Sequence, residues 1–275
     1  MQREITAEIL VIGNEVLQGD VLDTNSHWLC QKLTGLGASV RRVCQVRDEL
    51  ETIATCVRGF LERGADMLLT TGGLGPTTDD LTLEGISLAL GRPLALHPLA
   101  LEQVRATYAA LAQEGIVASA ELTPERRKMA QLPQGAEPLA NTVGAAPGVL
   151  LRHEGRVIIC LPGVPEELKD IFQGSLRPHL VALLGQGFFL EWRAIVACGD
   201  ESVLAPLLAP VVAAHPEVYV KSRAKRFNRE NRFLITLSAR GREPAQVEPL
   251  LAAAWEDLAA RLQGAGIEVV SLLTG

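Results

Sequence analysis

Short apolar runs alternate with amphipathic segments over the first third of the chain. Residues 7–13 and 66–71 are apolar runs that end at glycine, and residues 39–46 are strand-like, so all three are predicted to be β-strands. The intervening residues 24–35 and 49–63 place their apolar side chains on one face, which predicts helices. Strands separated by helices predict right-handed βαβ units and a mainly parallel sheet.

The pattern loosens after residue 71. Residues 81–90 and 98–113 predict two helices. Residues 149–152 and 156–161 alternate around a short polar turn, which predicts a β-hairpin. A further helix is predicted over residues 165–172, where a proline suits the first helical position.

A glycine-rich stretch at residues 174–187 predicts a domain boundary, with one domain over 1–175 and a second over 188–275. The pattern of the second domain predicts the order strand, helix, strand, strand, helix, strand. These elements are expected at residues 191–197, 201–214, 218–222, 232–239, 244–262 and 267–273. Such an order predicts a small α+β unit, the split-βαβ sandwich.

Composition narrows the class of protein. The chain has 275 residues, 48% hydrophobic and 21% charged, which excludes a disordered or fibrous protein. Its 26 basic and 32 acidic residues argue against a protein whose whole surface binds nucleic acid, although a local basic patch could still do so. The longest uncharged apolar stretch, 202–215, is shorter than the ~20 residues that a bilayer requires, and the N-terminus does not resemble a signal peptide. Five cysteines without a C-x-x-C pair argue against a zinc site or a disulfide framework, so a cytoplasmic protein is expected.

The strongest chemical pattern is the glycine-rich turn after the third predicted strand. In open α/β sheets, ligands bind beyond the carboxyl ends of the strands. Gly72, Gly73 and Gly75 allow the backbone to approach an anion and to direct N–H groups at it. Thr77 and Thr78 add hydroxyl donors. The turn is therefore predicted to hold a phosphate, although no Walker A lysine follows it.

Acidic residues accompany this turn. Asp79 and Asp80 would repel a bare phosphate, so they suggest a bridging cation such as Mg²⁺; alternatively, one of them caps the next helix. Glu15, in the turn after the first strand, joins them if the first and third strands are neighbours; alternatively, it is an exposed residue of a Gly-flanked turn. Asn25 is a further candidate donor to a phosphate or ribose.

Two later segments carry weaker candidates. Lys128 or Arg127 could neutralise a phosphate, although a basic triplet at 126–128 is more often a solvated helix face. Asn141 and the backbone of Gly144 could line a pocket.

Two other motifs leave their alternatives open. Residues 161–167 form a strand-to-helix turn in which Glu166 or Glu167 favours the helix N-terminus, with structural and functional interpretations equally open. The basic run 221–229 could bind RNA or a phosphate, but a solvated hairpin or a subunit contact is favoured, and the G-x-x-G loop of a KH clamp is missing.

Six ordered motifs together resemble the N-terminal domain of the competence/damage-inducible protein A family, which is related to the molybdopterin-binding domain of molybdenum cofactor biosynthesis proteins. The motifs are G-N-E-V-L-Q-G-D (13–20), D-T-N (23–25), T-G-G-L-G-P-T-T-D-D-L-T (71–82), R-K-M-A (127–130), N-T-V-G-A-A-P-G (141–148) and L-P-G-V-P-E-E (161–167). One departure is Asn14, where the family often has threonine.

The resemblance implies a three-layer α/β/α fold with a mixed sheet and a small KH-like C-terminal domain. It also implies ADP-ribose pyrophosphatase activity that requires a divalent metal, Mg²⁺ or Co²⁺, and is helped by potassium. Related domains bind molybdopterin. Longer members carry a deamidase domain, which is not expected here, and self-association, as a dimer, is expected on family grounds.

Two hypotheses follow for this chain. In the first, it cleaves ADP-ribose to AMP and ribose 5-phosphate. Asp80, with Asp79 or Glu15, would hold the metal, and Lys128 would offset charge on the leaving phosphate. In the second, the same pocket binds a molybdopterin or a nucleotide without turning it over. The sequence does not separate the two.

Overall fold

A six-stranded mixed sheet organises the first of two compact units into which the chain divides, at about residue 184. The computed structural model describes residues 4–185, 188–227, 230–241 and 243–274. The sheet has the order β2-β1-β3-β8-β7-β6, in which β2, β1, β3 and β8 are parallel and β7 pairs antiparallel with both β8 and β6. Its strands are β1 (Thr6–Ile12), β2 (Ser39–Val46), β3 (Met67–Thr71), β6 (Glu137–Leu139), β7 (Gly148–His153) and β8 (Arg156–Leu161). The prediction of a mixed, mainly parallel sheet is confirmed.

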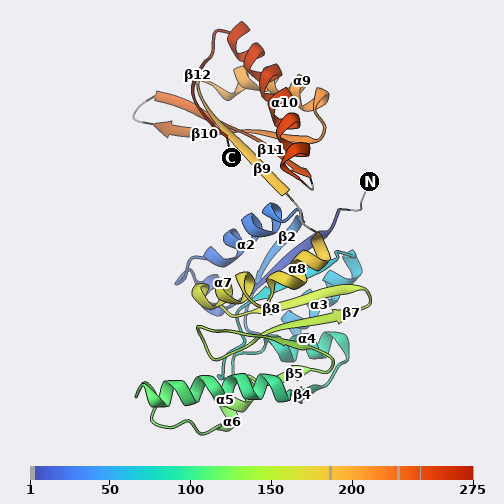
Figure 1. Cartoon of the computed structure of the whole chain (residues 1–275), viewed down its shortest axis with the longest axis vertical. Helices are drawn as coiled ribbons and strands as arrows, with labels where there is room; N and C mark the ends of the chain where they lie inside the picture. The colour runs from blue at the N-terminus through green and yellow to red at the C-terminus, as the bar shows by residue number, and fades with distance from the viewer. Residues whose placement is uncertain (1–3, 186–187, 228–229, 242, 275) are drawn as a thin grey trace. The chain divides into compact units, whose positions relative to one another are not determined.

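Helices cover both faces of this sheet, as the three-layer prediction required (Figure 1). On one face lie α2 (Thr24–Gly35), α7 (Pro165–Gln173) and α8 (Arg177–Leu184). On the other lie α3 (Leu50–Arg63) and α4 (Thr82–Leu90). The sequence pattern predicts a glycine-rich boundary without a helix at residues 174–187. Helix α8 shows that this prediction was wrong.

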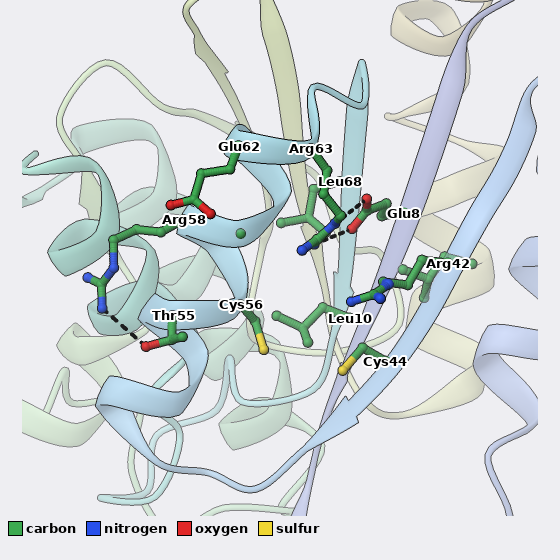
Figure 2. Close-up of a pocket in the computed structure, with 12 residues that line it drawn as sticks. Glu8, Leu10, Arg42, Cys44, Thr55, Cys56, Arg58, Glu62, Arg63 and Leu68 are labelled. Atoms are coloured by element: carbon green, nitrogen blue, oxygen red, sulfur yellow. Dashed lines mark hydrogen bonds and ion pairs between the residues drawn. The ribbon is translucent and has the colours of Figure 1, made fainter.

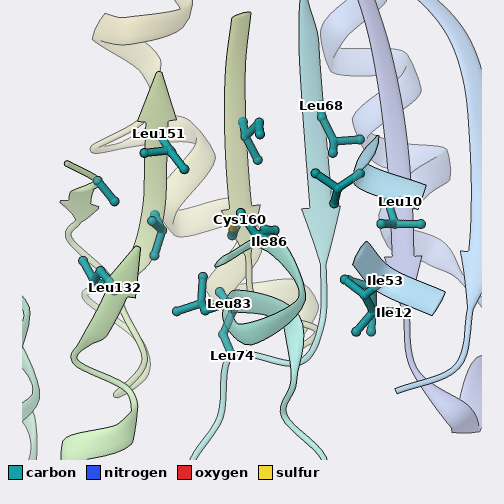
Figure 3. Packing of buried hydrophobic residues seen from close by; sticks show 14 of the residues in the cluster. Leu10, Ile12, Ile53, Leu68, Leu74, Leu83, Ile86, Leu132, Leu151 and Cys160 are labelled. Atoms are coloured by element: carbon teal, nitrogen blue, oxygen red, sulfur yellow. The ribbon is translucent and has the colours of Figure 1, made fainter. Parts of the chain in front are cut away.

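Alternate residues of each strand point to opposite faces of the sheet, and in β1 and β3 both sets are buried beneath helices. Leu10 and Ile12 of β1 and Leu68 of β3 belong to one buried cluster with Ile53 of α3 and Ile86 of α4 (Figure 3). The intervening strand residues point to the opposite face, and they are buried too. A parallel strand whose two faces are both covered must be apolar throughout, which explains the apolar runs in the sequence.

On the second face, α2 and α7 meet through an aromatic pair. The rings of Trp28 and Phe172 pack edge to face with centroids 5.0 Å apart. Close by in sequence, Asn25 of α2 donates from Nδ2 to the carbonyl oxygen of Gly163, which precedes α7, at 2.7 Å. The first turns of these two helices are thereby fixed beside the ends of β1 and β8.

The remaining elements of the first unit lie around the sheet. A short helix, α1 (Asn14–Gln18), occupies the place where a Gly-flanked turn was expected. Strands β4 (Leu94–Leu96) and β5 (Gln131–Pro133) form a two-stranded ladder that the sequence pattern did not predict. Helix α5 (Pro98–Gln113) was predicted, and α6 (Pro124–Lys128) follows it and bears the basic triplet.

The second unit is a four-stranded antiparallel sheet with two helices. Its strand order, β10-β11-β9-β12, with the element order βαββαβ, is that of the split-βαβ sandwich predicted from the pattern. This arrangement describes the unit more closely than the KH-like domain that the resemblance implied. The elements are β9 (Phe188–Ala197), α9 (Glu201–Ala214), β10 (Val218–Phe227), β11 (Glu230–Gly241), α10 (Pro244–Gly264) and β12 (Glu268–Thr274).

The basic run lies mostly on the first arm of a hairpin. Strand β10 pairs antiparallel with β11, with Lys221 opposite Thr236, as the solvated-hairpin interpretation requires. Residues 228 and 229 of the run lie outside the described residues. Across the part of the chain that the structure describes, no helix has the length and apolar character needed to cross a membrane.

Candidate ligand-binding site

A pocket of about 570 Å³ opens where the carboxyl ends of β1, β3 and β8 meet. Because β1 pairs with β3 and β3 with β8, all in parallel, the turns that follow these strands lie together. The condition on which the placement of Glu15 beside the glycine-rich turn depended, that the first and third strands are neighbours, is met. The pocket volume falls within the range of small-molecule sites. Its lining includes Glu15, Gly73, Leu74, Gly75, Asp80 and Glu167, together with apolar side chains from several segments.

The glycine-rich turn after β3 lines this pocket and contains backbone N–H groups that are unpaired among the described residues. Gly72 adopts φ 97°, and a Cβ at this position would overlap the carbonyl oxygen of Ile12. Its N–H donates to the carbonyl oxygen of Leu161 at 3.0 Å. The next three N–H groups, of residues 73–75, form no hydrogen bond within the described residues. Adjacent unpaired N–H groups that line a pocket form an anion-binding concavity.

Asp80 folds back to hold the turn. Its Oδ2 accepts hydrogen bonds from the backbone N–H of Thr77 at 2.8 Å and from its Oγ1 at 2.6 Å. Thr77 Oγ1 also contacts Asp79, and that hydrogen bond lowers the pKa of the Asp79 carboxyl. Helix α4 has no side-chain cap, so the alternative in which one of these aspartates caps that helix is not what the structure contains.

Lys128 reaches the same turn from α6. Its Nζ donates to the carbonyl oxygens of Thr77 and Asp80, each at 2.6 Å, and lies 3.7 Å from Oε1 of Glu84. The ammonium group is therefore bound to the back of the turn, against a small hollow that adjoins the pocket. In this position it stabilises the conformation of the glycine-rich segment.

Glu167 lines the pocket and is hydrogen-bonded to Asn141. Asn141 donates from Nδ2 to Oε2 of Glu167 at 2.7 Å, and its Oδ1 accepts from the backbone N–H of Gly144 at 2.8 Å. A Cβ at Gly144 would overlap the Glu167 carboxylate, so only glycine permits this approach. Burial raises the pKa of Glu167, and the Asn141 hydrogen bond partly opposes that shift.

The sequence interpretation missed Asp48, which follows β2. Its Oδ2 accepts from the backbone N–H of Asn14 at 2.8 Å and so fixes the start of α1. Burial raises the pKa of Asp48, and the nearby carboxylates of Glu15 and Asp79 raise it further. The clue was present in the sequence, because Asp48 follows the second predicted strand at the same sheet edge as the other candidates.

Comparison with known proteins identifies the family of the domain that contains this site. Residues 8–182 match the family described as "Probable molybdopterin binding domain". The chain belongs to this family. The CinA protein of unknown function from Thermoplasma acidophilum superposes with a TM-score of 0.58 and 35% identity, over 64% of this chain and 98% of that one. The resemblance to the competence/damage-inducible protein A family is thus confirmed.

Relatives that match a longer part of this chain come from archaea. A protein of Aeropyrum pernix is 46% identical over 222 residues, 81% of this chain and 80% of its own length. A protein of Pyrococcus abyssi is 42% identical over 206 residues, 75% of this chain and 80% of its own length. Both matches extend beyond the molybdopterin-binding domain into the second unit, since each spans more residues than the 8–182 match.

The carboxylates of this molybdopterin-binding domain suit a hard divalent cation only in part. Oxygen ligands are those that Mg²⁺ prefers, and the carboxylates of Glu15 and Asp79 are each near enough to Asp48 to raise its pKa. No group of three or more metal-ligating side chains converges among the described residues. Since Mg²⁺ is often held by one or two carboxylates and the phosphates of a ligand, the residues fit a metal that is shared with a ligand.

Five of the predicted ligand-binding residues are not among those that line this pocket: Asn25, Thr77, Thr78, Asn141 and Gly144. Asn25 is only 8% exposed, and its amide is bound to Gly163 at the edge of a smaller hollow of about 70 Å³. Thr77 and Thr78 are exposed beside the turn, and neither lines the pocket.

A second cavity, of about 320 Å³, lies between the sheet and α3 (Figure 2). It is flanked by Arg63, which binds Glu8 through two hydrogen bonds of 2.8 and 2.6 Å. The thiols of Cys44 and Cys56 point toward each other there, and burial raises the pKa of Cys56, as does Cys44. A raised pKa disfavours the reactive thiolate. The cavity also lies away from the strand ends, so the first pocket is the better candidate.

Proposed function

We propose that the pocket binds a phosphorylated pterin or nucleotide, with its phosphate on the backbone N–H groups of Gly73, Leu74 and Gly75. The observation that carries the proposal is this row of three unpaired donors inside a pocket at the carboxyl edge of parallel strands. Membership of the molybdopterin-binding family supports a pterin as one class of ligand.

Hydrolysis of ADP-ribose, the more specific hypothesis, has less support. The side chain of Asp80 accepts hydrogen bonds from its own turn, and Lys128 is engaged by two carbonyl groups behind it. Both are therefore best placed to shape the phosphate cradle. A divalent metal, bound by Glu15 or Asp79 together with ligand phosphates, would supply charge neutralisation and Lewis acidity.

Binding is tested by calorimetric titration with a phosphorylated pterin and with AMP, each with and without Mg²⁺. Saturable binding is expected, and Gly73→Ala should weaken it because a Cβ there would overlap Oγ1 of Thr82 and displace the cradle. Gly91→Ala is the matched control. Gly91 has nearly the same φ, 62° against 65°, ends α4, and has nothing within 4 Å of an added Cβ.

Turnover is tested in parallel. The protein is incubated with ADP-ribose and Mg²⁺ or Co²⁺, and AMP is measured. Saturable binding without AMP supports the proposal. If AMP accumulates, the protein hydrolyses ADP-ribose, and the ligand-binding site is also a catalytic site. If no phosphorylated pterin or nucleotide binds, the assignment of the pocket fails.

A further inference from the structure

The charged side chains that line the pocket are all acidic: Glu15, Asp80 and Glu167. Asp80 is occupied by Thr77, and Glu15 is exposed next to the phosphate turn. Glu167 is half-buried, as Asp80 is, but its hydrogen-bond partner is Asn141 rather than its own turn, and its carboxylate packs against Gly144. It is therefore the one pocket carboxylate, among the described residues, that is neither exposed nor bound to the glycine-rich turn.

The Glu167 carboxylate is fixed in place and retains accepting capacity. Asn141 donates to Oε2, whereas Oε1 accepts no hydrogen bond from the residues that the structure describes. Gly144 leaves room for the carboxylate directly above its Cα. A carboxylate has about four accepting positions, so most of its capacity is open to a ligand. Leaving Oε1 of this half-buried carboxylate without a donor is costly, which favours a ligand that provides N–H groups.

Apolar side chains surround this acceptor. Val21, Leu74, Met129 and Val164 line the same pocket, and they suit the faces of a flat heterocycle. A heterocycle bound between these side chains must therefore carry N–H donors on the edge that faces Glu167.

Resting on the proposed function, we propose that Glu167 selects ligands by the edge that pterin and guanine share, a ring N–H beside an exocyclic amino group. Two parallel N–H donors match the two oxygens of a carboxylate, and charge-assisted hydrogen bonds of this kind are strong. Adenine places an accepting ring nitrogen beside its amino group, which would face the carboxylate lone pairs. Glu167 thus acts as a specificity determinant, while the cradle at Gly73–Gly75 binds the phosphate of any of these ligands.

Three nucleotides test this, because they share a ribose phosphate and differ only in the base edge. Guanosine monophosphate offers two donors to Glu167, inosine monophosphate offers one, and adenosine monophosphate offers a mismatched pair. Affinity should fall in that order, by about tenfold for each hydrogen bond lost to the carboxylate. A phosphorylated pterin, titrated alongside, distinguishes the two sources of the edge, since the tighter ligand identifies the ring for which the wall is shaped.

Glu167→Gln should abolish the order of the three nucleotides, because the amide still accepts from Asn141 but cannot accept two donors. It should not weaken the binding of adenosine monophosphate, whose ring nitrogen no longer faces the lone pairs of a carboxylate. Glu166→Gln, in the same helical turn but exposed, is the matched control and should preserve the order. A merely structural role for Glu167 would weaken all three ligands equally. If the wild-type protein binds the three nucleotides equally, the inference is wrong while the proposed function stands. If none binds and the pterin does not, both fail.

Discussion

Lys128→Met tests whether the glycine-rich turn depends on a cation bound behind it. Methionine retains the length and apolar character of the lysine stem but removes the ammonium group, which donates to the carbonyl oxygens of Thr77 and Asp80 at 2.6 Å each. Hydrogen bonds that involve a charged group contribute about 1.5–3 kcal/mol. The Lys128 side chain is 22% exposed, so we take the lower end, about 3 kcal/mol for the pair.

This energy sets the equilibrium between the closed and open turn. A loss of about 3 kcal/mol makes opening roughly 100-fold more frequent. Hydrogen exchange at the amides of Thr77 and Thr82 reports it, because these donate to Asp80 and to the carbonyl oxygen of Gly73 within the turn. Ligand affinity should fall by up to the same factor, as the binding-competent population shrinks.

Arg127→Met is the control, since Arg127 is the exposed neighbour of Lys128 on the same short helix. It should leave both the exchange rates and the affinity near the wild-type values. If Lys128→Met also leaves both unchanged, the ammonium group does not hold the turn, and the position we assign to it has no functional consequence.

Two other predictions concern stability. Arg63→Met should lower the free energy of unfolding by about 3 kcal/mol, measured in urea, because it leaves the carboxylate of Glu8, only 4% exposed, buried without a partner; Arg58→Met, which removes an exposed pair, should have an effect close to zero. Burial raises the pKa of Glu167 above its usual 4.5, so the native state keeps this proton to a higher pH than the unfolded chain, and stability falls as pH rises through that interval. Glu167→Gln should remove this fall, and an identical pH profile would contradict the assigned shift.

Most of the first sheet was predictable because its strands are buried on both faces. That burial demands the apolar runs found at β1 and β3, and the glycines after them mark where each strand ends. The ladder of β4 and β5 escaped prediction because each strand has only three residues and its partner lies far away in sequence. Helix α8 escaped because the flanking glycines outweighed the short apolar stretch between them.

For the site, the sequence predicted at which edge of the sheet the candidate residues lie, but not which groups their side chains contact. The rule that ligands bind at strand ends is enough to bring Glu15 and the glycine-rich turn to one edge of the sheet. It could not show that Lys128 contacts Thr77, 51 residues away, or that Asn141 binds Glu167, 26 residues away. Such contacts depend on how the α6 segment and the helices pack, which local patterns do not specify.

The pocket is lined by acidic side chains, yet it can bind an anionic ligand because backbone N–H groups would attract the phosphate. Lysine and arginine do not line the cavity among the residues that the structure describes, so a phosphate would be attracted by the dipoles of Gly73, Leu74 and Gly75 rather than by a full positive charge. Carboxylates so close to that cradle would oppose the phosphate unless a cation lies between them. Burial raises the pKa of Asp48, and repulsion from the neighbouring acids adds to the shift. A divalent ion that arrives with the ligand would relieve this repulsion, and binding of phosphate and metal should therefore be cooperative.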